Sequence, residues 1–395
     1  MTYDDNGGAP SPGYYSDAAK VSTRDYGDNA LLALYTIQRL PVRGIPTGFC
    51  HIMEHSVIER FADVSPGSYI NDPHGVYLKM MRNIGVCVID QYIAENPLTM
   101  EAYGYEEREK SATEGGTAEL DGITIDGPEN AARHMEEFLI PNLKKHVEGF
   151  SEKAIVQSFI NNESRVQAML GNNILKASHG TVTFPGLHYG MYGYEPYFTA
   201  YAQYPEIIER IFSLQADYAV MHNTALVKAF TRAGLPRYCR LDHDMADSRG
   251  LLCSPSSLEK LWLPHFARSI KPVVDADFTL LWHCDGNLME LVPFLIDSGI
   301  NGFQGFQYED GMDYINICKM KPKRGGRMVI QAGISVTRSL PFGTPDTVAR
   351  EMRFLVENGP PHMLLAMSSS CVPGTPYENI RTCVEGFRYY RKHGR

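Results

Sequence analysis

The feature that most constrains the fold is a repeated strand and helix pattern in the second half of the chain, from Tyr238 onward. Short apolar runs alternate with longer amphipathic stretches, and glycine or proline stands at the joints. Such units form parallel strands that are joined by right-handed helical crossovers. The strands of five such units read "YCRL", "FTLLW", "INGFQGF", "RMVIQAG" and "HMLLAM".

The first half of the chain supplies further strands but fewer clean units. Two more strands read "GIPTGFCHI" and "GVCVIDQYI", and three helical patterns stand between the second of them and Tyr238. A total of seven or eight strands with helical crossovers favours a (β/α)₈ TIM-like barrel over a doubly wound sheet. The absence of a Gly-x-Gly-x-x-Gly after the first strand and of a Walker sequence argues against dinucleotide and P-loop folds.

The predicted domain organisation is a single barrel with additions. Residues 1–40 are expected to form an amino-terminal arm, because the chain starts with a polar stretch rich in Gly, Pro and Asp. Residues 41–395 are expected to form the barrel. A polar, glycine-rich insert at about 94–130 is expected to cap the carboxyl face of the strands, together with a tyrosine-rich stretch, "FPGLHYGMYGYEPYFTAYAQY".

The net charge and the cysteine content argue against several classes of function. The net charge is −9 and the pI is near 5.8, which argues against binding to nucleic acid or to an anionic membrane. No apolar run reaches the roughly 18 residues of a membrane span. The eight cysteines include no C-x-x-C pair, so reduced thiols and a cytoplasmic location are expected.

Polar and thiol residues gather where the predicted strands end. Functional residues of such barrels lie at the carboxyl ends of the strands. Strand ends also meet solvent, which is a second explanation for polar residues there. Lys and Glu, the usual solvated choices, are nevertheless missing from these positions. The positions are Cys50, His51, Asp90, Gln91, Tyr92, Asp242, His243, Asp244, His283, Cys284, Asp285, Gln304, Gln307, Gln331, Ser335 and Ser368 to Cys371.

Several longer motifs resemble the uroporphyrinogen decarboxylase superfamily, which includes corrinoid-dependent methyltransferases. They are "HCDGNLMELVPFLIDSGINGFQGFQYEDGMD", "QAGIS", "GTPDTVAREMRFLVENG", "SSSCVPGTPYENIRTCVE", "LDHDMADSRGLLCSPSSLEKLWLPHFARSI" and "DPHGVYLKMMRNIGVCVIDQY". The resemblance covers most of the chain from Pro41 to His393. It implies the same (β/α)₈ barrel that the strand count predicts.

The resemblance favours the methyltransferase branch. True decarboxylases carry an arginine-rich "RQAGRY"-type segment, whereas the corresponding region here reads "PVRGIPTGFCHIMEH" and offers only Arg43. The branch that serves coenzyme M holds zinc with an H-x-C pair and a distant Cys. In this chain His283 matches, but Asp285 replaces the Cys of the pair, while Cys371 lies in the loop of the distant Cys.

The resemblance therefore implies methyl transfer to cob(I)alamin from a small donor, which is either a methoxylated compound, preferably aromatic, or of the methylamine type. An ether or amine leaving group must be protonated or coordinated as the methyl group departs. His283, Asp285, Asp242 and Asp244 are the predicted catalytic residues. A zinc ion held by His283, Asp285 and Cys371 and a metal-free acid and base pair remain two alternatives. The predicted substrate-binding residues are His51, Gln91, Tyr189, Tyr192, Gln304 and Gln307.

The corrinoid is expected on a partner, a small cobalamin-binding protein. The base-off motif D-x-H-x-x-G is absent, because the one candidate, His74, has Tyr77 where the glycine should stand. Strand periodicity places the side chains of His283 and Asp285 on one side and Cys284 on the other.

Features of the sequence also bear on three other functions. A lyase like uroporphyrinogen decarboxylase and a non-catalytic binding barrel remain alternatives. The segment "HIMEH", His51 to His55, matches an inverted zinc-peptidase pattern, which requires both histidines on one helix. Because His51 follows a predicted strand, the two histidines are expected to straddle a turn from strand to helix.

Overall fold

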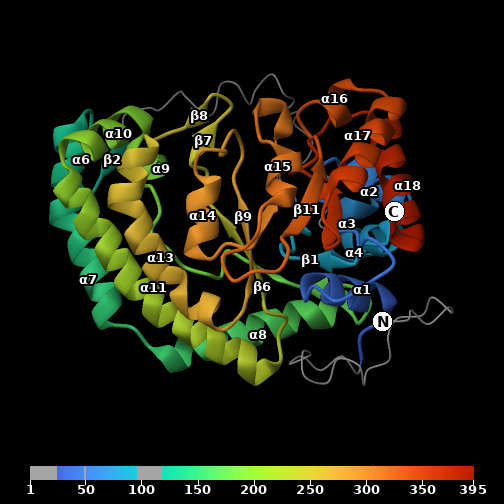
Figure 1. Cartoon of the computed structure of the whole chain (residues 1–395), viewed down its shortest axis with the longest axis horizontal. Helices are drawn as coiled ribbons and strands as arrows, with labels where there is room; N and C mark the ends of the chain where they lie inside the picture. The colour runs from blue at the N-terminus through green and yellow to red at the C-terminus, as the bar shows by residue number, and fades with distance from the viewer. Residues whose placement is uncertain (1–24, 49, 96–117, 306) are drawn as a thin grey trace.

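The computed structural model describes residues 25–48, 50–95, 118–305 and 307–395. The chain forms a mixed α/β fold in which a curled parallel sheet is covered on its outside by helices (Figure 1). The predicted arm and insert fall partly on residues 1–24 and 96–117, which lie outside the described residues.

The central sheet has six parallel strands in the order β12-β11-β10-β9-β6-β5. Strands that are adjacent in this sheet also follow one another along the chain, apart from the hairpin strands between β6 and β9. This order is expected for strands joined by helical crossovers. The strands are β5 (Ser178–His179), β6 (Tyr238–Asp242), β9 (Thr279–His283), β10 (Gly302–Gln304), β11 (Val329–Ile334) and β12 (Met363–Met367). The mixed α/β class and the parallel sheet of the second half are thus confirmed.

An eight-stranded ladder that closes on itself is not present among the described residues. β5 and β12 are the edges of the sheet, and β1 (Val88–Ile89) and β4 (Leu175–Lys176) form a separate parallel pair. The physical reason is that the strands of the first half are very short: Thr47 contributes only one bridge, to Leu365 of β12. Single backbone hydrogen bonds continue the path, from Cys87 N to Thr47 O at 2.8 Å and from Ala177 N to Ile89 O at 2.7 Å.

Helices of the second half follow the strands in the predicted order. Their starts are specified locally, since Thr344 accepts a hydrogen bond from Thr347 N and Asp313 accepts one from Asn316 N. They are α12 (Pro255–Ser257), the π-helical turn η3 (Leu258–Trp262), α13 (Leu263–Asp275), α14 (Val292–Ser298), the 3₁₀ turn η4 (Tyr308–Asp310), α15 (Tyr314–Lys319), α16 (Ser339–Phe342), α17 (Pro345–Asn358) and α18 (Tyr377–His393).

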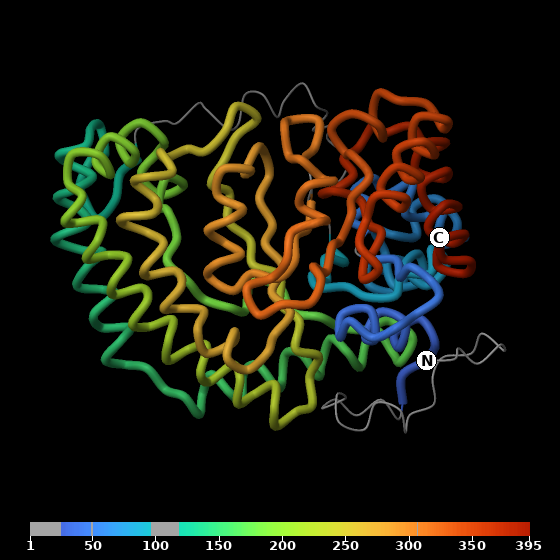
Figure 2. The backbone as a smooth tube through the Cα atoms, viewed as in Figure 1, coloured from blue at the N-terminus to red at the C-terminus, as the bar shows by residue number. Residues whose placement is uncertain are grey.

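The first half contributes a second group of helices, and each half contains one small hairpin. Figure 2 shows the first half of the chain passing along the outside of the sheet at both sides of the molecule. The helices are α1 (Asp28–Ile37), α2 (His55–Ala62), α3 (Ser68–Asn71), α4 (Pro73–Ile84), α6 (Pro128–His134), the π-helical turn η2 (Met135–Leu139), α7 (Ile140–Glu148), α8 (Glu152–Leu170), α9 (Tyr189–Tyr192), α10 (Tyr194–Gln203) and α11 (Pro205–Ala233). The hairpins are β2 (Ala118–Leu120) with β3 (Ile123–Ile125) and β7 (Ala246–Asp247) with β8 (Gly250–Leu251).

Two apolar layers hold the sheet. Inside its curve, Tyr238, Leu281 and Leu364 pack with residues of α1, including Leu34, in one buried cluster. The stretch assigned to an amino-terminal arm, residues 1–40, therefore includes a helix that belongs to the packed unit. Outside the curve, aromatic residues fill the space between sheet and helices, with Trp262, Phe266 and Trp282 in mutual contact.

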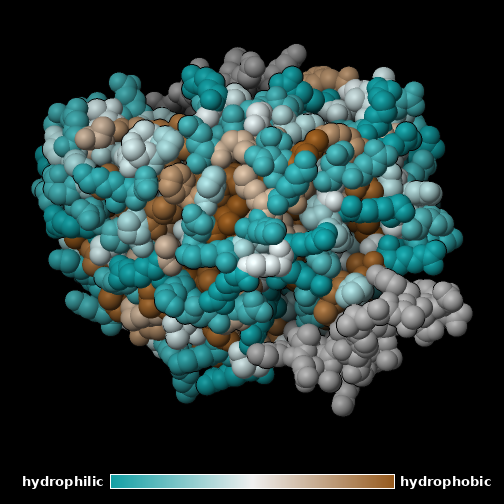
Figure 3. Space-filling view, viewed as in Figure 1, coloured by the Kyte–Doolittle hydropathy of each residue, from teal (hydrophilic) through white to brown (hydrophobic). Residues whose placement is uncertain are grey.

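The surface view in Figure 3 is mostly hydrophilic, with hydrophobic residues in small groups. Within the described ranges, no helix is both long and apolar enough to cross a bilayer.

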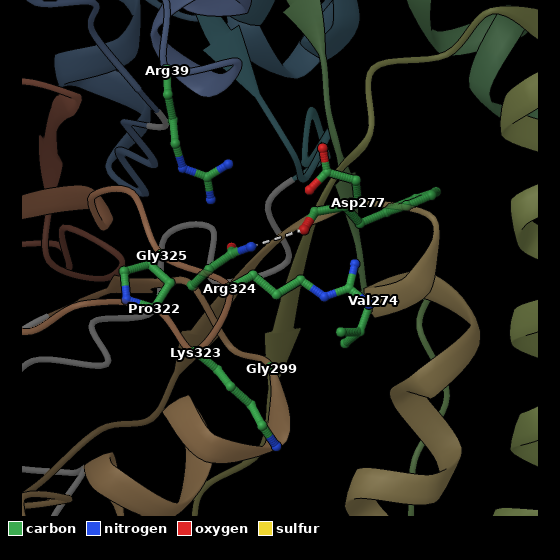
Figure 4. Close-up of a pocket in the computed structure, with 10 residues that line it drawn as sticks. Arg39, Val274, Asp277, Gly299, Pro322, Lys323, Arg324 and Gly325 are labelled. Atoms are coloured by element: carbon green, nitrogen blue, oxygen red, sulfur yellow. Dashed lines mark hydrogen bonds between the residues drawn. The ribbon is translucent and has the colours of Figure 1, made fainter.

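A small cavity of about 90 Å³ lies at the amino ends of the strands, and Figure 4 shows the long side chains of Arg39, Lys323 and Arg324 around it. Lys323 Nζ donates to Asp297 O at 2.6 Å, and Arg324 pairs with Asp275 at 2.8 Å. These side chains already have hydrogen-bond partners, since Arg39 Nε also donates to Arg327 O at 3.1 Å, and this end of such folds generally serves stability. The basic "KPKRGGR" segment thus forms the turn between α15 and β11.

Candidate functional site

The strand register brings four polar residues into one row across the carboxyl ends of the sheet. Asp242 of β6 stands beside His283 of β9, His283 stands beside Gln304 of β10, and Gln304 stands beside Gln331 of β11. Alternation along each strand turns all four side chains to the same face of the sheet. The sequence predicted these strand ends, and the fold places them next to one another.

Asp242, Asp244 and His283 form the tightest group of titratable side chains. One ligand atom from each lies within 4.8 Å of the others, and this is the one such group of three among the described parts of the chain. Both aspartates are exposed, whereas His283 is only 6% exposed. Gly305, at φ +68°, lets the backbone pass the imidazole closely, because a Cβ there would stand 2.5 Å from His283 Nδ1. The buried imidazole thus packs against backbone, while both carboxylates reach the surface.

The side chains of His179 and Arg240 hold one oxygen of Asp242. His179 Nε2 lies 3.0 Å and Arg240 Nη1 lies 3.2 Å from Asp242 Oδ2. Partial burial alone would raise the pKa of this carboxyl group, but the hydrogen bond to His179 and the charges of His283 and Arg240 outweigh it and lower the pKa to about 2. Asp242 is therefore an ionised carboxylate at neutral pH.

Arg240 links the site to the interior. Its Nε donates to Asp90 Oδ2 at 2.6 Å, and both side chains are almost fully buried, with 5% and 3% exposed. Nη1 also donates to Gln304 Oε1 at 3.3 Å, while Nη2 is buried and makes no hydrogen bond to a described residue. Burial would raise the pKa of Asp90, but the charge of Arg240 outweighs it and keeps the pKa below the usual value. The buried ion pair thus anchors the group at the strand ends.

Asp285 lies close to His283 but outside the tightest group. The distance from its Oδ1 to His283 Nε2 is 3.9 Å, and Gln307 Nε2 donates to the same oxygen at 3.3 Å. Cys284 points the other way, into the core, where its Sγ accepts a hydrogen bond from Met245 N at 3.3 Å. Burial raises the pKa of Cys284 to about 12, so this thiol is not a thiolate at neutral pH.

The structure does not bring Cys371 to the group, so the tentative zinc ligand set of His283, Asp285 and Cys371 is not assembled. Cys371 is 1% exposed and belongs to the main hydrophobic cluster. Its backbone pairs with the segment around Ile52, and Cys371 N donates to His51 O at 2.8 Å. This pairing turns the thiol into the core, and burial raises its pKa to about 12. The structure places Asp242 and Asp244 beside His283 instead.

The predicted substrate-binding residues fall into two groups. Gln304, Gln307 and Gln91 belong to the hydrogen-bonded network around Asp242. They contact Arg240, Asp285 and His179 in turn, and Gln91 Nε2 is 3.5 Å from His179 Nε2. Tyr189 also reaches it, since its hydroxyl donates to Asp244 O at 2.9 Å. Tyr192 is buried elsewhere, where its hydroxyl lies 2.9 Å from His134 Nδ1.

His51 lies beside the segment that follows β12, where its Nδ1 is 2.9 Å from Ser370 Oγ. The helix α2 begins only at His55, so His51 and His55 straddle a turn, and the inverted peptidase pattern is not formed.

Two residues of the network were not predicted from the sequence. His179 ends β5, which has only two residues and no apolar run before it. Arg240 lies inside β6, within the predicted strand "YCRL", but no role was assigned to it from the sequence. An arginine flanked by buried strand residues is itself a useful signal, because a guanidinium in a core needs a buried carboxylate partner.

The donor set fits a divalent metal ion. Two carboxylates and one imidazole suit zinc and neighbouring transition metals, whereas magnesium prefers an all-oxygen set. The two hydrogen bonds to Asp242 both use Oδ2, which leaves Oδ1 for a ligand. The same three side chains can also hold a polar or cationic group directly.

Burial of His51 predicts a pH-dependent stability. The ring is 5% exposed, and burial lowers its pKa to about 4, below the unfolded value of 6.5. The unfolded state therefore takes up the proton first, so stability is full above pH 6.5 and falls as the pH drops towards 4. Between pH 7 and 4.5, wild type should lose about 2–3 kcal/mol more unfolding free energy than His51→Gln. Urea titrations at several pH values measure the unfolding free energies of both proteins. A difference between wild type and His51→Gln that does not change with pH would contradict the prediction.

Comparison with known proteins supports the fold. No family model matches the sequence, and no curated protein matches it significantly. The chain is similar to a solved structure described as a methyltransferase from Methanosarcina mazei, with a TM-score of 0.53 and 14% identity over 92% of this chain and 98% of that chain. It aligns less well, with a TM-score of 0.43 and 13% identity over 88% of this chain and 98% of that chain, with a putative vitamin-B12 independent methionine synthase from Listeria monocytogenes. The first likeness supports a common fold, and the second is too low for any conclusion.

Proposed function

We propose that this chain is a methyltransferase that moves a methyl group from a small methoxylated or methylamine-type donor to cob(I)alamin carried by a separate corrinoid protein. The observation that carries the proposal is the group of Asp242, Asp244 and His283 at the carboxyl ends of adjacent strands. A second support is the fold shared with a structure described as a methyltransferase. The sequence motifs that resemble corrinoid-dependent methyltransferases add a third.

We further propose that the sheet and the short strands of the first half together form an eight-membered (β/α)₈ arrangement. The backbone hydrogen bonds around Thr47, Cys87 and Ala177 support this, because they place one short segment after another between β12 and β5. Residues 41–395 are then one barrel unit. In this arrangement the carboxyl ends of the strands form a single mouth.

The residues at the mouth would act on the leaving atom of the donor. Asp242 and Asp244 offer carboxylate oxygens, and His283 offers an imidazole nitrogen from the neighbouring strand. His179 and Arg240 fix Asp242 by its Oδ2, and Gln307 holds Asp285 beside His283. Such fixed partners matter because a catalytic group must be held within a fraction of an ångström of its working position.

A zinc ion is compatible with this site and would polarise the leaving atom as a Lewis acid. The residues that would hold it are Asp242, Asp244 and His283. Without metal, the same groups would bind the leaving group by hydrogen bonds and charge. Analysis of bound metal in protein purified without chelators separates the two forms.

A corrinoid partner requires a mouth that a large cofactor can approach. Asp242 and Asp244 are exposed, so reacting atoms held at this group can be reached from outside the sheet. A cavity closed over the carboxylates would not permit in-line attack by a cobalt ion on another protein. The proposal therefore includes a transient complex over the carboxyl ends of the strands.

An assay of methyl transfer to free cob(I)alamin tests the function. The purified chain is mixed with cob(I)alamin and a panel of methoxylated aromatics and methylated amines, and the loss of the cob(I)alamin absorbance is followed. At least one donor should give a rate that is proportional to enzyme concentration. A decarboxylase-like lyase or a binding barrel would leave the absorbance unchanged with every donor, and that result would contradict the proposal.

The decarboxylase alternative has less support from the residues at the mouth. A polycarboxylate substrate needs cationic side chains, and Arg240 is already paired with Asp90 and Asp242. Arg43 precedes the first strand segment, and its carbonyl lies against Gly394 at the end of the chain. The mouth is therefore acidic, which is unfavourable for a polyanionic substrate.

A further inference from the structure

Three aromatic side chains stand beside the acidic group, and we call them the aromatic wall: Tyr189, Tyr194 and Phe198. The ring centroids of Tyr189 and Tyr194 are 4.8 Å apart, and Phe198 lies 5.8 Å from Tyr189. Tyr194 is 45% exposed, although large aromatic residues are normally well covered. The wall therefore presents aromatic surface to solvent next to the proposed site.

The wall is held in position by its own contacts. The hydroxyl of Tyr189 donates to the backbone oxygen of Asp244 at 2.9 Å, and its ring stacks on His243 at 6.2 Å. His243 is in turn fixed by a hydrogen bond from Leu187 N to its Nε2 at 2.8 Å. The wall is thus tied to the same loop that carries Asp244.

The charge beside the wall is negative. Asp242 is paired with Arg240, but none of the ion pairs formed by the described residues includes Asp244. Asp244 is exposed, and the charge of Asp244 contributes to the raised pKa values of both Tyr189 and Tyr194, after the effect of burial. A carboxylate without a cationic partner and an exposed ring thus adjoin each other.

An aromatic face and an unpaired carboxylate are complementary to an organic cation. Ring faces attract ammonium groups through their quadrupole, and methylated ammonium groups are typical ligands of such surfaces. A neutral methoxylated aromatic would gain ring stacking but nothing from the carboxylate. We propose, on the basis of the methyl transfer proposed above, that the methyl donor of this site is a quaternary methylammonium compound.

The chemistry of the leaving group agrees with this donor class. The bond between a methyl carbon and the ammonium nitrogen breaks, and its electron pair stays on nitrogen, which leaves as a neutral tertiary amine. The carbon accepts the electron pair of cobalt(I) from the cob(I)alamin of the partner. No proton is required. An ether donor, by contrast, leaves as an anion and needs an acid or a Lewis acid at its oxygen.

A binding experiment isolates the charge of the donor. Choline and its neutral carbon analogue 3,3-dimethylbutan-1-ol have nearly the same shape, and calorimetry compares their affinities for the full chain. Choline should bind about 3- to 30-fold more tightly, the range expected for a cation at aromatic rings. Equal affinities, or binding of neither compound, would overturn the inference.

Variants locate the binding to the wall. Tyr194→Leu and Asp244→Asn should each weaken choline binding several-fold and leave the affinity for the neutral analogue unchanged. Tyr389→Leu is the matched control, because Tyr389 is 59% exposed on α18, away from the strand ends. If Tyr389→Leu weakens choline binding as much as Tyr194→Leu, the assignment to the wall is wrong.

Turnover separates this inference from the proposed function. In the cob(I)alamin assay, choline or tetramethylammonium should react faster than methoxybenzoates. If only methoxybenzoates react, the donor class is wrong and the methyltransferase function stands. If no donor of either class reacts, the methyltransferase function itself is contradicted.

Discussion

His283→Gln should lower the rate of methyl transfer by about 10²-fold or more, the usual range for losing a positioned acid, base or ligand. His283 ends β9 beside Asp242 and is the buried member of the group, with 6% of its surface exposed. Glutamine keeps a polar side chain of similar length but removes the imidazole. Because the ring packs against Gly305, the loss should appear in the chemical step and leave the fold intact.

The control for this substitution is His265→Gln, since His265 lies on the outer helix α13 and away from the strand ends. Its rate should stay within about twofold of wild type, because surface substitutions away from such features have small effects. Single-turnover rates with excess cob(I)alamin separate the chemical step from donor binding. Equal rates for wild type and His283→Gln would remove the imidazole from the mechanism.

Arg240→Met should lower the free energy of unfolding by about 3–5 kcal/mol, because it leaves a buried carboxylate without its cation. Asp90 is the stranded group, with 3% of its side chain exposed and a 2.6 Å contact to Arg240 Nε. Chemical denaturation at pH 7 measures the loss. The double variant with Arg240→Met and Asp90→Asn should regain part of the lost free energy of unfolding, since the second substitution removes the uncompensated charge.

The matched control is Arg268→Met on α13. Arg268 pairs with Asp217 at 2.6 Å, but both side chains are 43% exposed, so the pair should contribute at most about 1 kcal/mol. If Arg240→Met and Arg268→Met lower the free energy of unfolding by the same amount, the ion pair of Arg240 and Asp90 is not the anchor described above. If the double variant is no more stable than Arg240→Met, stranded charge is not the cause of the loss.

The sequence predicted the strands of the second half because they are long enough to show apolar runs between clear helices. Asp242, His283 and Gln304 follow from this, since strand register and alternation decide which residues share a row. The first half was harder to predict. Its strands have only two residues each at β1 and β4, and no periodicity can be read from so short a run.

The direction of side chains at loop positions was the second feature that could not be predicted from the sequence. Cys371 was placed near the strand ends correctly along the chain, but the bridge to Ile52 turns its thiol into the core. Tyr192 and Tyr189 are neighbours on one short helix, and only Tyr189 reaches the loop of Asp244. Such directions depend on contacts between segments that are far apart in sequence, so no local pattern reveals them.

The most direct measurement of the central claim is the single-turnover rate of methyl transfer to cob(I)alamin, with wild type, His283→Gln and Asp244→Asn compared side by side. If Asp242, Asp244 and His283 hold the reacting groups, wild type should consume cob(I)alamin with a methyl donor, and both variants should be slower, His283→Gln by about 10²-fold or more. A wild type that transfers methyl groups at the same rate as both variants would contradict the assignment of this site.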